Sequence, residues 1–200
     1  GYYGRFNRTI RLGESKINST LIFQGELSVY KRKAFREFED KKGSDDTGTV
    51  IDIVSAGYRT IFVPNAVFYD AAHYSFRGRM TAKTRRAQHL IYGLAKAVML
   101  KLKRRMSIPA SIVFMDFFLY VLNPILGLLL VATFVYFAFS VPILLVLLPL
   151  TLIPKRLRVM FVLYITSNLA LLLAILRCII GDKQVAWKKI DETRHSSHAL

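Results

Sequence analysis

The feature that most constrains the fold is a long apolar stretch in the second half of the chain. No charged residue occurs from Phe117 to Pro154, and a second uncharged run extends from Val159 to Leu176. A membrane-spanning helix needs about 20 predominantly apolar residues, so the first run is long enough for about two spans and the second for one. We therefore expect a transmembrane region of two or three helices at residues 108–181, followed by a polar tail at residues 182–200.

The number of spans depends on how residues 142–154 are used. A turn near Ser140-Val141-Pro142 divides the first run into two helices, and the nearby prolines bend or end helices. If residues 142–154 form a re-entrant or interfacial segment, only two spans remain. Three spans place the polar tail outside, whereas its lysines favour the inside. Hydropathy leaves both topologies open.

The charge distribution favours a membrane setting over nucleic acid. The chain has 29 Lys and Arg against 13 Asp and Glu, and such an excess of positive charge also suits phosphate binding. However, the basic residues are concentrated just before the apolar half, and no acidic residue occurs between Ala71 and Met115. Basic residues beside a span mark its cytoplasmic side. We expect a multi-pass protein of the cell membrane, with residues 1–76 cytoplasmic, membrane lipids as partners and no nucleic acid.

The basic connector, residues 77–107, has the pattern of an amphipathic helix. From Thr84 to Arg105, apolar residues recur at steps of three and four and basic residues lie on the other side. Such a helix lies in the interface of an anionic membrane. Docking against the soluble domain is the alternative, and both can hold at once. The apolar positions are Ala87, Leu90, Ile91, Leu94, Val98, Met99 and Leu102.

Residues 1–76 have the mixed composition of a soluble domain. Two β-rich stretches, near Leu21 and near Ile61, enclose a charged segment at residues 31–40 and a short helix over Thr47–Ala56, which Gly57 ends. The order β, α, α, β predicts an α/β domain, followed by the interfacial helix and the transmembrane helices.

Two adjacent carboxylates precede the short helix. Asp45 and Asp46 lie at its N-terminus, where backbone N–H groups and the helix dipole favour negative charge. A helix cap is therefore one explanation of this pair. General-base catalysis is another, because a hydroxyl becomes a useful nucleophile when a positioned carboxylate takes its proton.

Three motifs carry a resemblance to a known family. "IFQGELSVYKRKAF", "SDDTGTVIDIVSAGYRTIFVPNA" and "QHLIYG" resemble, in this order, segments of the membrane-integrated family 2 glycosyltransferases, which include cellulose, chitin and hyaluronan synthases. The resemblance extends to the membrane helices and the closing "WKK" tail. It implies that residues 1–76 are the acceptor-side part of an α/β domain of the GT-A type.

The resemblance also implies site residues. Asp46 matches the carboxylate that acts as catalytic base in the family, and Asp45 would support it on the acceptor side. The "IFQGE" stretch would lie beside the acceptor, although an ordinary strand and turn also explains it. This places Phe23, Gln24, Gly25 and Glu26 near the acceptor.

The "QHLIY" motif departs from its family counterpart, which helps to hold donor and acceptor. Gln88 is kept, but Ile91 stands where relatives carry Arg, and Tyr92 stands where they carry Trp. Arg85 and Arg86 lie one turn earlier and are the expected substitutes. The departure puts processive polymer synthesis in doubt.

A larger departure concerns the donor. Family members carry an earlier nucleotide-binding half with an Asp-x-Asp motif, and no such motif occurs ahead of Lys41. We therefore expect the donor-binding half to be missing from this chain and supplied by a longer enzyme or a separate chain. The complete enzyme is expected to use a divalent cation, Mg²⁺ or Mn²⁺, with no metal ligands in these residues.

Two functional hypotheses follow from these observations. The first is the acceptor-side and membrane portion of an inverting glycosyltransferase, which transfers a sugar from a nucleotide-sugar donor to a lipid-linked or glycan acceptor. The second is a non-catalytic membrane subunit or scaffold of a multi-chain complex. A donor-binding half directly upstream would favour the first, and an authentic start codon there the second.

Overall fold

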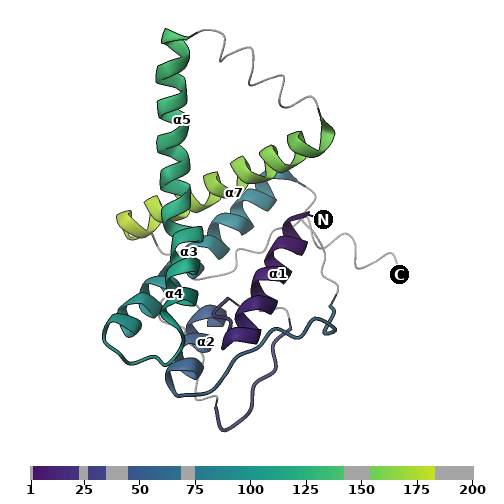
Figure 1. Ribbon diagram of the computed structural model, residues 1–200, viewed down its shortest axis with the longest axis vertical. Helices are drawn as coiled ribbons and strands as arrows, with labels where there is room; N and C mark the ends of the chain where they lie inside the picture. The colour runs from purple at the N-terminus through teal and green to yellow at the C-terminus, as the bar shows by residue number, and fades with distance from the viewer. Residues whose placement is uncertain (1, 23–26, 35–44, 69–74, 142–153, 183–200) are drawn as a thin grey trace.

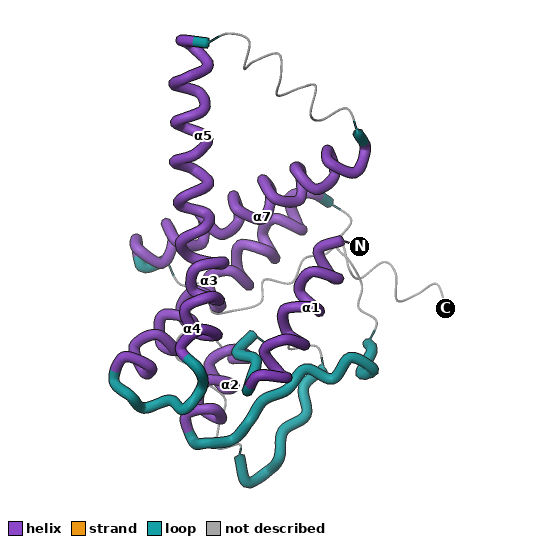
Figure 2. The backbone as a smooth tube through the Cα atoms, viewed as in Figure 1, coloured by secondary structure: helices purple, strands orange, loops and turns teal. Residues whose placement is uncertain are grey.

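The structure is a computed structural model that describes residues 2–22, 27–34, 45–68, 75–141 and 154–182. The described elements are helices joined by irregular segments (Figures 1 and 2). In chain order they are α1 (Tyr2–Ile17), α2 (Asp45–Ser55), α3 (Phe76–Leu102), α4 (Ala110–Phe117), the π-helical segment η1 (Phe118–Leu122), α5 (Asn123–Ser140) and α7 (Lys155–Ile180).

The expectation of an α/β domain is wrong. Within the described residues no strand is present (Figure 2). The two β-rich stretches do meet, because the backbone N–H of Thr20 donates to the carbonyl of Thr60 at 3.0 Å. Other backbone carbonyls in this region accept hydrogen bonds from side chains. The Thr60 hydroxyl donates to the Thr20 carbonyl, and Arg59 donates to the carbonyls of Ser15 and Asn18. These contacts between distant segments take the place of a β ladder, and the β propensity of the sequence is overridden.

The main hydrophobic core joins α2 to α3 and α4. Residues Val50, Ile51 and Val54 on one side of α2 are almost fully buried. They belong to a cluster completed by Leu21, Ala97, Met106, Ile108, Ile112 and Val113. Since Ile112 and Val113 belong to α4, this core attaches the segment before residue 76 to the start of the long apolar helix.

Helix α3 covers most of the stretch in which the apolar periodicity predicts a helix. It begins earlier than predicted, because Ser75 caps it by accepting a hydrogen bond from the N–H of Gly78 at 3.0 Å. Helices α2, α4 and α7 pack against it. Of the predicted apolar face, Ala87, Ile91 and Leu94 are buried by these neighbours, whereas Met99 and Leu102 are exposed. Helix α3 is therefore docked on protein along much of its length.

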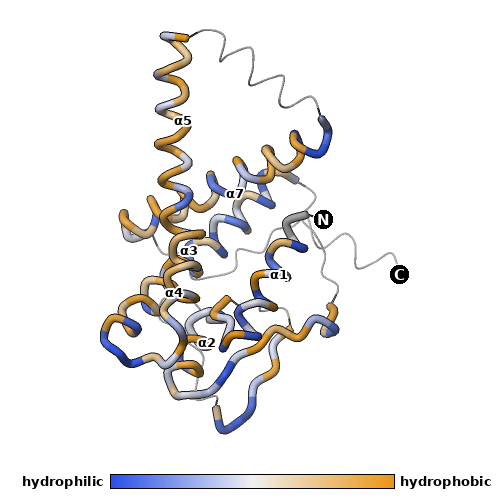
Figure 3. Tube along the Cα trace, in the orientation of Figure 1, coloured by the Kyte–Doolittle hydropathy of each residue, from blue (hydrophilic) through white to orange (hydrophobic). Residues whose placement is uncertain are grey.

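Two helices are long and apolar enough to cross a membrane. One runs through α4, η1 and α5 as 31 residues from Ala110 to Ser140, and the other is α7, with 26 residues. Both are mostly exposed apolar surface, and α5 extends away from the other helices (Figures 1 and 3). The first helix ends where a turn is expected, at Ser140. The disputed segment, residues 142–153, lies outside the described residues.

The two long helices cross near the beginning of α5. Asn123 donates a hydrogen bond to Asn168 at 3.4 Å, and Gly127 faces the Tyr164 hydroxyl. Helix α7 continues along α3, while α5 leaves in a different direction (Figure 1). The described helices therefore form a helical base with one projecting apolar helix.

Candidate active site

The proposed catalytic pair lies at the first turn of α2. Asp45 is the first residue of the helix, and Asp46 follows with its side chain half-buried. The helix ends as predicted, because Gly57 adopts a φ of 87° that other residues rarely reach. The pair therefore lies within the first turn, at the positive end of the helix dipole, rather than at the N-cap position before the helix.

Helix α2 runs along α3 beside the "QHLIYG" motif. Thr47 packs directly on Gly93, the last residue of that motif. Further along, the carboxylate of Asp52 pairs with Lys96 at 2.9 Å. The "SDD" segment and the "QHLIYG" motif are therefore neighbours. Asp46 lies one residue before Thr47, at which the two helices meet.

Gln88 and Tyr92 are held against the end of α7. Gln88 is 1% exposed, and its amide donates to the carbonyl of Asp182, just after the helix. Its Oε1 is buried without a hydrogen-bond partner in the part of the chain that the structure describes. The pKa of Tyr92 is raised chiefly by burial and also by the nearby Cys178 thiol, against the opposing effect of Gln88.

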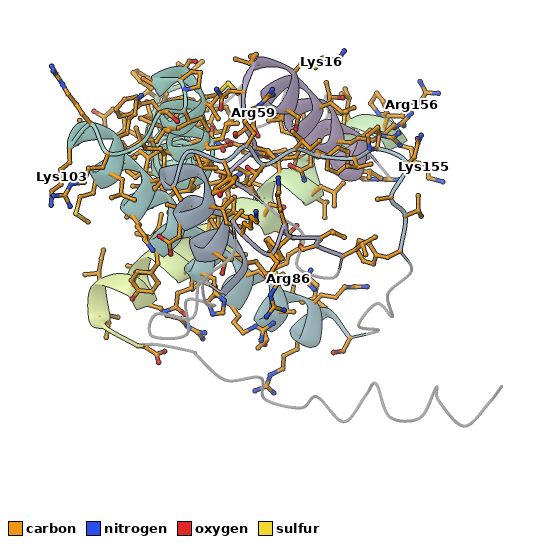
Figure 4. All side chains as sticks on the ribbon, turned by 90° about the horizontal axis from the view of Figure 1, so that it is seen from below. Lys16, Arg59, Arg86, Lys103, Lys155 and Arg156 are labelled. Carbon is orange, nitrogen blue, oxygen red and sulfur yellow. The ribbon has the colours of Figure 1, made fainter. Side chains whose placement is uncertain are left out.

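The remaining positions of the motif are also accounted for. Ile91, where relatives carry Arg, is buried in a cluster with Ala87 and Ala174 of α7, a site that suits an apolar side chain. Arg85 is half-buried and Arg86 is exposed on the outer side of α3 (Figure 4). Basic side chains project from several sides of the molecule, including Lys103 near the end of α3 (Figure 4).

Two further predictions concern the acceptor-binding residues and the divalent cation. Phe23, Gln24, Gly25 and Glu26, which the resemblance placed beside the acceptor, lie outside the described residues. Within the described residues, no group of three or more His, Cys, Asp or Glu side chains could hold a metal ion. These residues therefore do not fit a divalent cation, and we assign it no step.

A buried charged cluster between α1 and α4 was not predicted from the sequence. Arg11 forms a two-pronged ion pair with Asp116, with N–O distances of 2.9 Å and 3.2 Å. Arg11 also pairs with Glu14 at 2.7 Å. The exposed fraction of the side chain is 6% for Arg11, 0% for Asp116 and 2% for Glu14. Tyr120 completes the network by donating to Asn7. The cluster fixes α1 to the base of the long apolar helix.

The cluster holds two carboxylates and one guanidinium. The pKa of Glu14 is raised to about 7, chiefly by burial and also by the charge of Asp116, against the opposing effect of Arg11. A pocket of about 200 Å³ lies beside Glu14, and none of the predicted site residues lines it. The sequence did contain a signal, because Asp116 is the one acidic residue between Asp70 and Asp182. An isolated charge at the edge of an apolar run is usually functional or paired.

Comparison with known proteins gives one informative result. No protein-family model and no curated protein matches the chain. Among solved structures, the chain is similar to a glycosyltransferase, which confirms that part of the resemblance seen in the sequence. That structure is the mannosyltransferase PcManGT from Pyrobaculum calidifontis in complex with GDP-Man and Mn²⁺.

The similarity covers most of this chain but only part of the solved structure. The TM-score is 0.72 at 28% sequence identity, over 89% of this chain and 51% of the mannosyltransferase. The chain thus spans about half the length of that protein.

Proposed function

We propose that the chain is the acceptor-side and membrane portion of an inverting, family 2-like glycosyltransferase. The observation that carries the proposal is the packing of the Asp46 helix onto Gly93, the residue directly after the Gln88–Tyr92 segment, in a chain similar to a mannosyltransferase. The donor-binding half lies outside these 200 residues. The complete protein is a multi-pass membrane enzyme whose soluble part faces the cytoplasm.

Asp46 is the general base in this proposal. Its carboxylate takes the proton of the acceptor hydroxyl while the hydroxyl oxygen attacks the anomeric carbon of the donor sugar. The bond from that carbon to the nucleoside diphosphate breaks, and its electron pair leaves with the diphosphate. Attack from the opposite face inverts the configuration. Gln88 and Tyr92 lie on α3 within one to five residues of the contact residue Gly93, and in this proposal they help to hold the donor and the acceptor.

The substrates are proposed by class. The donor is a nucleotide-sugar, and GDP-mannose is the first to test because the mannosyltransferase structure contains it. The acceptor is lipid-linked or a glycan, since two helices are long and apolar enough to bring the site to a membrane. A divalent cation would neutralise the diphosphate when bound, but its ligands are expected in the donor-binding half.

The proposal is tested by measuring sugar transfer with the complete protein. The chain, together with its donor-binding half, is reconstituted in lipid vesicles with GDP-mannose and a membrane lipid extract. We expect release of GDP together with a new mannosylated lipid or glycan of inverted configuration. Absence of transfer from GDP-mannose and from a panel of other nucleotide-sugars, in a folded preparation, would instead support the scaffold hypothesis.

A further inference from the structure

A glycine in the middle of α3 marks a close approach of α2. Gly93 lies inside a helix of 27 residues, where glycine is unfavourable because it loses more backbone freedom than alanine. A Cβ placed on Gly93 would lie 2.5 Å from Cγ2 of Thr47 and 3.1 Å from its Cβ. The first separation is shorter than real Cβ atoms show, so the hydrogen side chain is what lets the two helices meet here.

Thr47 has little freedom to move away from an added methyl group. Its side chain is β-branched and 7% exposed, and β-branched side chains in helices have few allowed rotamers. The adjacent Val50 and Ile51 are fully buried in the core shared with α3. Because such cores are close-packed, an alanine at residue 93 displaces the first turn of α2 rather than one side chain.

Asp46 directly precedes Thr47, so a displacement of that turn moves the carboxylate with it. We infer that Gly93 is a positioning residue, which sets the place of Asp46 relative to the Gln88–Tyr92 segment through its contact with Thr47. This inference rests on the proposed function. A misplacement of about 1 Å can cost roughly a hundredfold in rate, so one methyl group has a measurable effect.

The experiment compares Gly93→Ala with the double variant Gly93→Ala/Thr47→Ser in the complete protein. Serine keeps the hydroxyl and removes the methyl group that the new Cβ would meet. We expect Gly93→Ala to lower kcat by roughly tenfold to a hundredfold with an unchanged KM for the donor, which binds to the other half. The double variant should recover most of the lost rate. Gly13→Ala is the matched control, because a Cβ there meets nothing within 4 Å.

Several results would overturn the inference. These are a wild-type rate in Gly93→Ala, a double variant that is folded but no faster than Gly93→Ala, and an equal loss in Gly13→Ala. If Gly93→Ala does not fold, recovery of folding in the double variant supports the contact and its failure to recover contradicts it. If the wild type transfers no sugar, the proposed function fails separately, and the Tm values of the same variants still test whether Thr47 excludes a side chain at residue 93.

Discussion

At the residue scale, the buried cluster of Arg11, Glu14 and Asp116 explains how a polar helix is attached to an apolar one. The three groups are removed from water, and Arg11 pairs with both carboxylates at short distances. Such a cluster adds little stability compared with apolar packing, but removing one partner leaves an uncompensated buried charge. The attachment of α1 therefore depends strongly on each member.

We expect Arg11→Met to destabilise the protein by about 3–5 kcal/mol, because Asp116 and Glu14 then stay buried without their shared cationic partner. Asp52→Asn is the matched control, since Asp52 pairs with Lys96 at the surface. Exposed pairs contribute roughly 0–1 kcal/mol, so its effect should be small. Thermal unfolding in detergent measures both variants, and an equal Tm shift for the two would contradict this account of the cluster.

Glu14 should make stability depend on pH. Its pKa of about 7 in the folded protein lies above the ordinary value of 4.5, so the folded state binds the proton more tightly than the unfolded state. Stability therefore falls as pH rises from 4.5 to about 7 and stays lower above it, by up to about 3 kcal/mol from this group.

Glu14→Gln removes this titration and keeps the size of the side chain. The difference in Tm between wild type and variant, measured from pH 5 to pH 8, should change steadily in favour of the variant as pH rises. A difference that does not vary with pH would show that Glu14 is not the titrating group.

At the scale of elements, the helices were more predictable from the sequence than the rest. The period of apolar residues indicates α3, and the Asp-Asp start and Gly57 stop frame α2, because both signals are local. The prediction of strands was wrong because side chains bond to the backbone of both β-rich stretches. Thr60 donates to the Thr20 carbonyl, and the N–H of Phe62 donates to the Ser15 hydroxyl, contacts between segments far apart in the chain. The Arg11–Asp116 pair could not be predicted for the same reason, because its two residues are far apart in the chain.

The apolar helix from Ala110 to Ser140 should cross the membrane once. Ser107 and Ser140 are both exposed and lie at the two ends of this helix. Each is replaced by a single cysteine in a Cys178→Ala background. We expect a membrane-impermeant maleimide to label Ser107→Cys from the cytoplasmic side and Ser140→Cys from the opposite side. Labelling of both from the same side of sealed vesicles would rule out this span.

At the scale of the whole molecule, α3 connects the candidate site with the membrane helices. It carries Gly93 against α2, and Gln88 and Tyr92 against α7. The motifs "SDD" and "QHLIYG" could be read from the sequence, but their juxtaposition could not, because it depends on how α2 and α3 pack in the core that they share. The apolar period predicted that Ile91 lies on a buried face, but not that α7 covers it.

The measurement that tests the central claim most directly is the transfer rate of Asp46→Asn in the complete protein, together with its thermal stability. Asp46 lies in the first turn of α2, where the loss of its charge costs only about 0.3–1 kcal/mol of interaction with the helix dipole, but asparagine cannot accept the proton of the acceptor. We predict a nearly unchanged Tm and a loss of roughly 10²–10⁴-fold in rate. Asp52→Asn on the same helix is the control and should keep its rate. A stable Asp46→Asn protein that transfers sugar at the wild-type rate would contradict the assignment of Asp46 as the base.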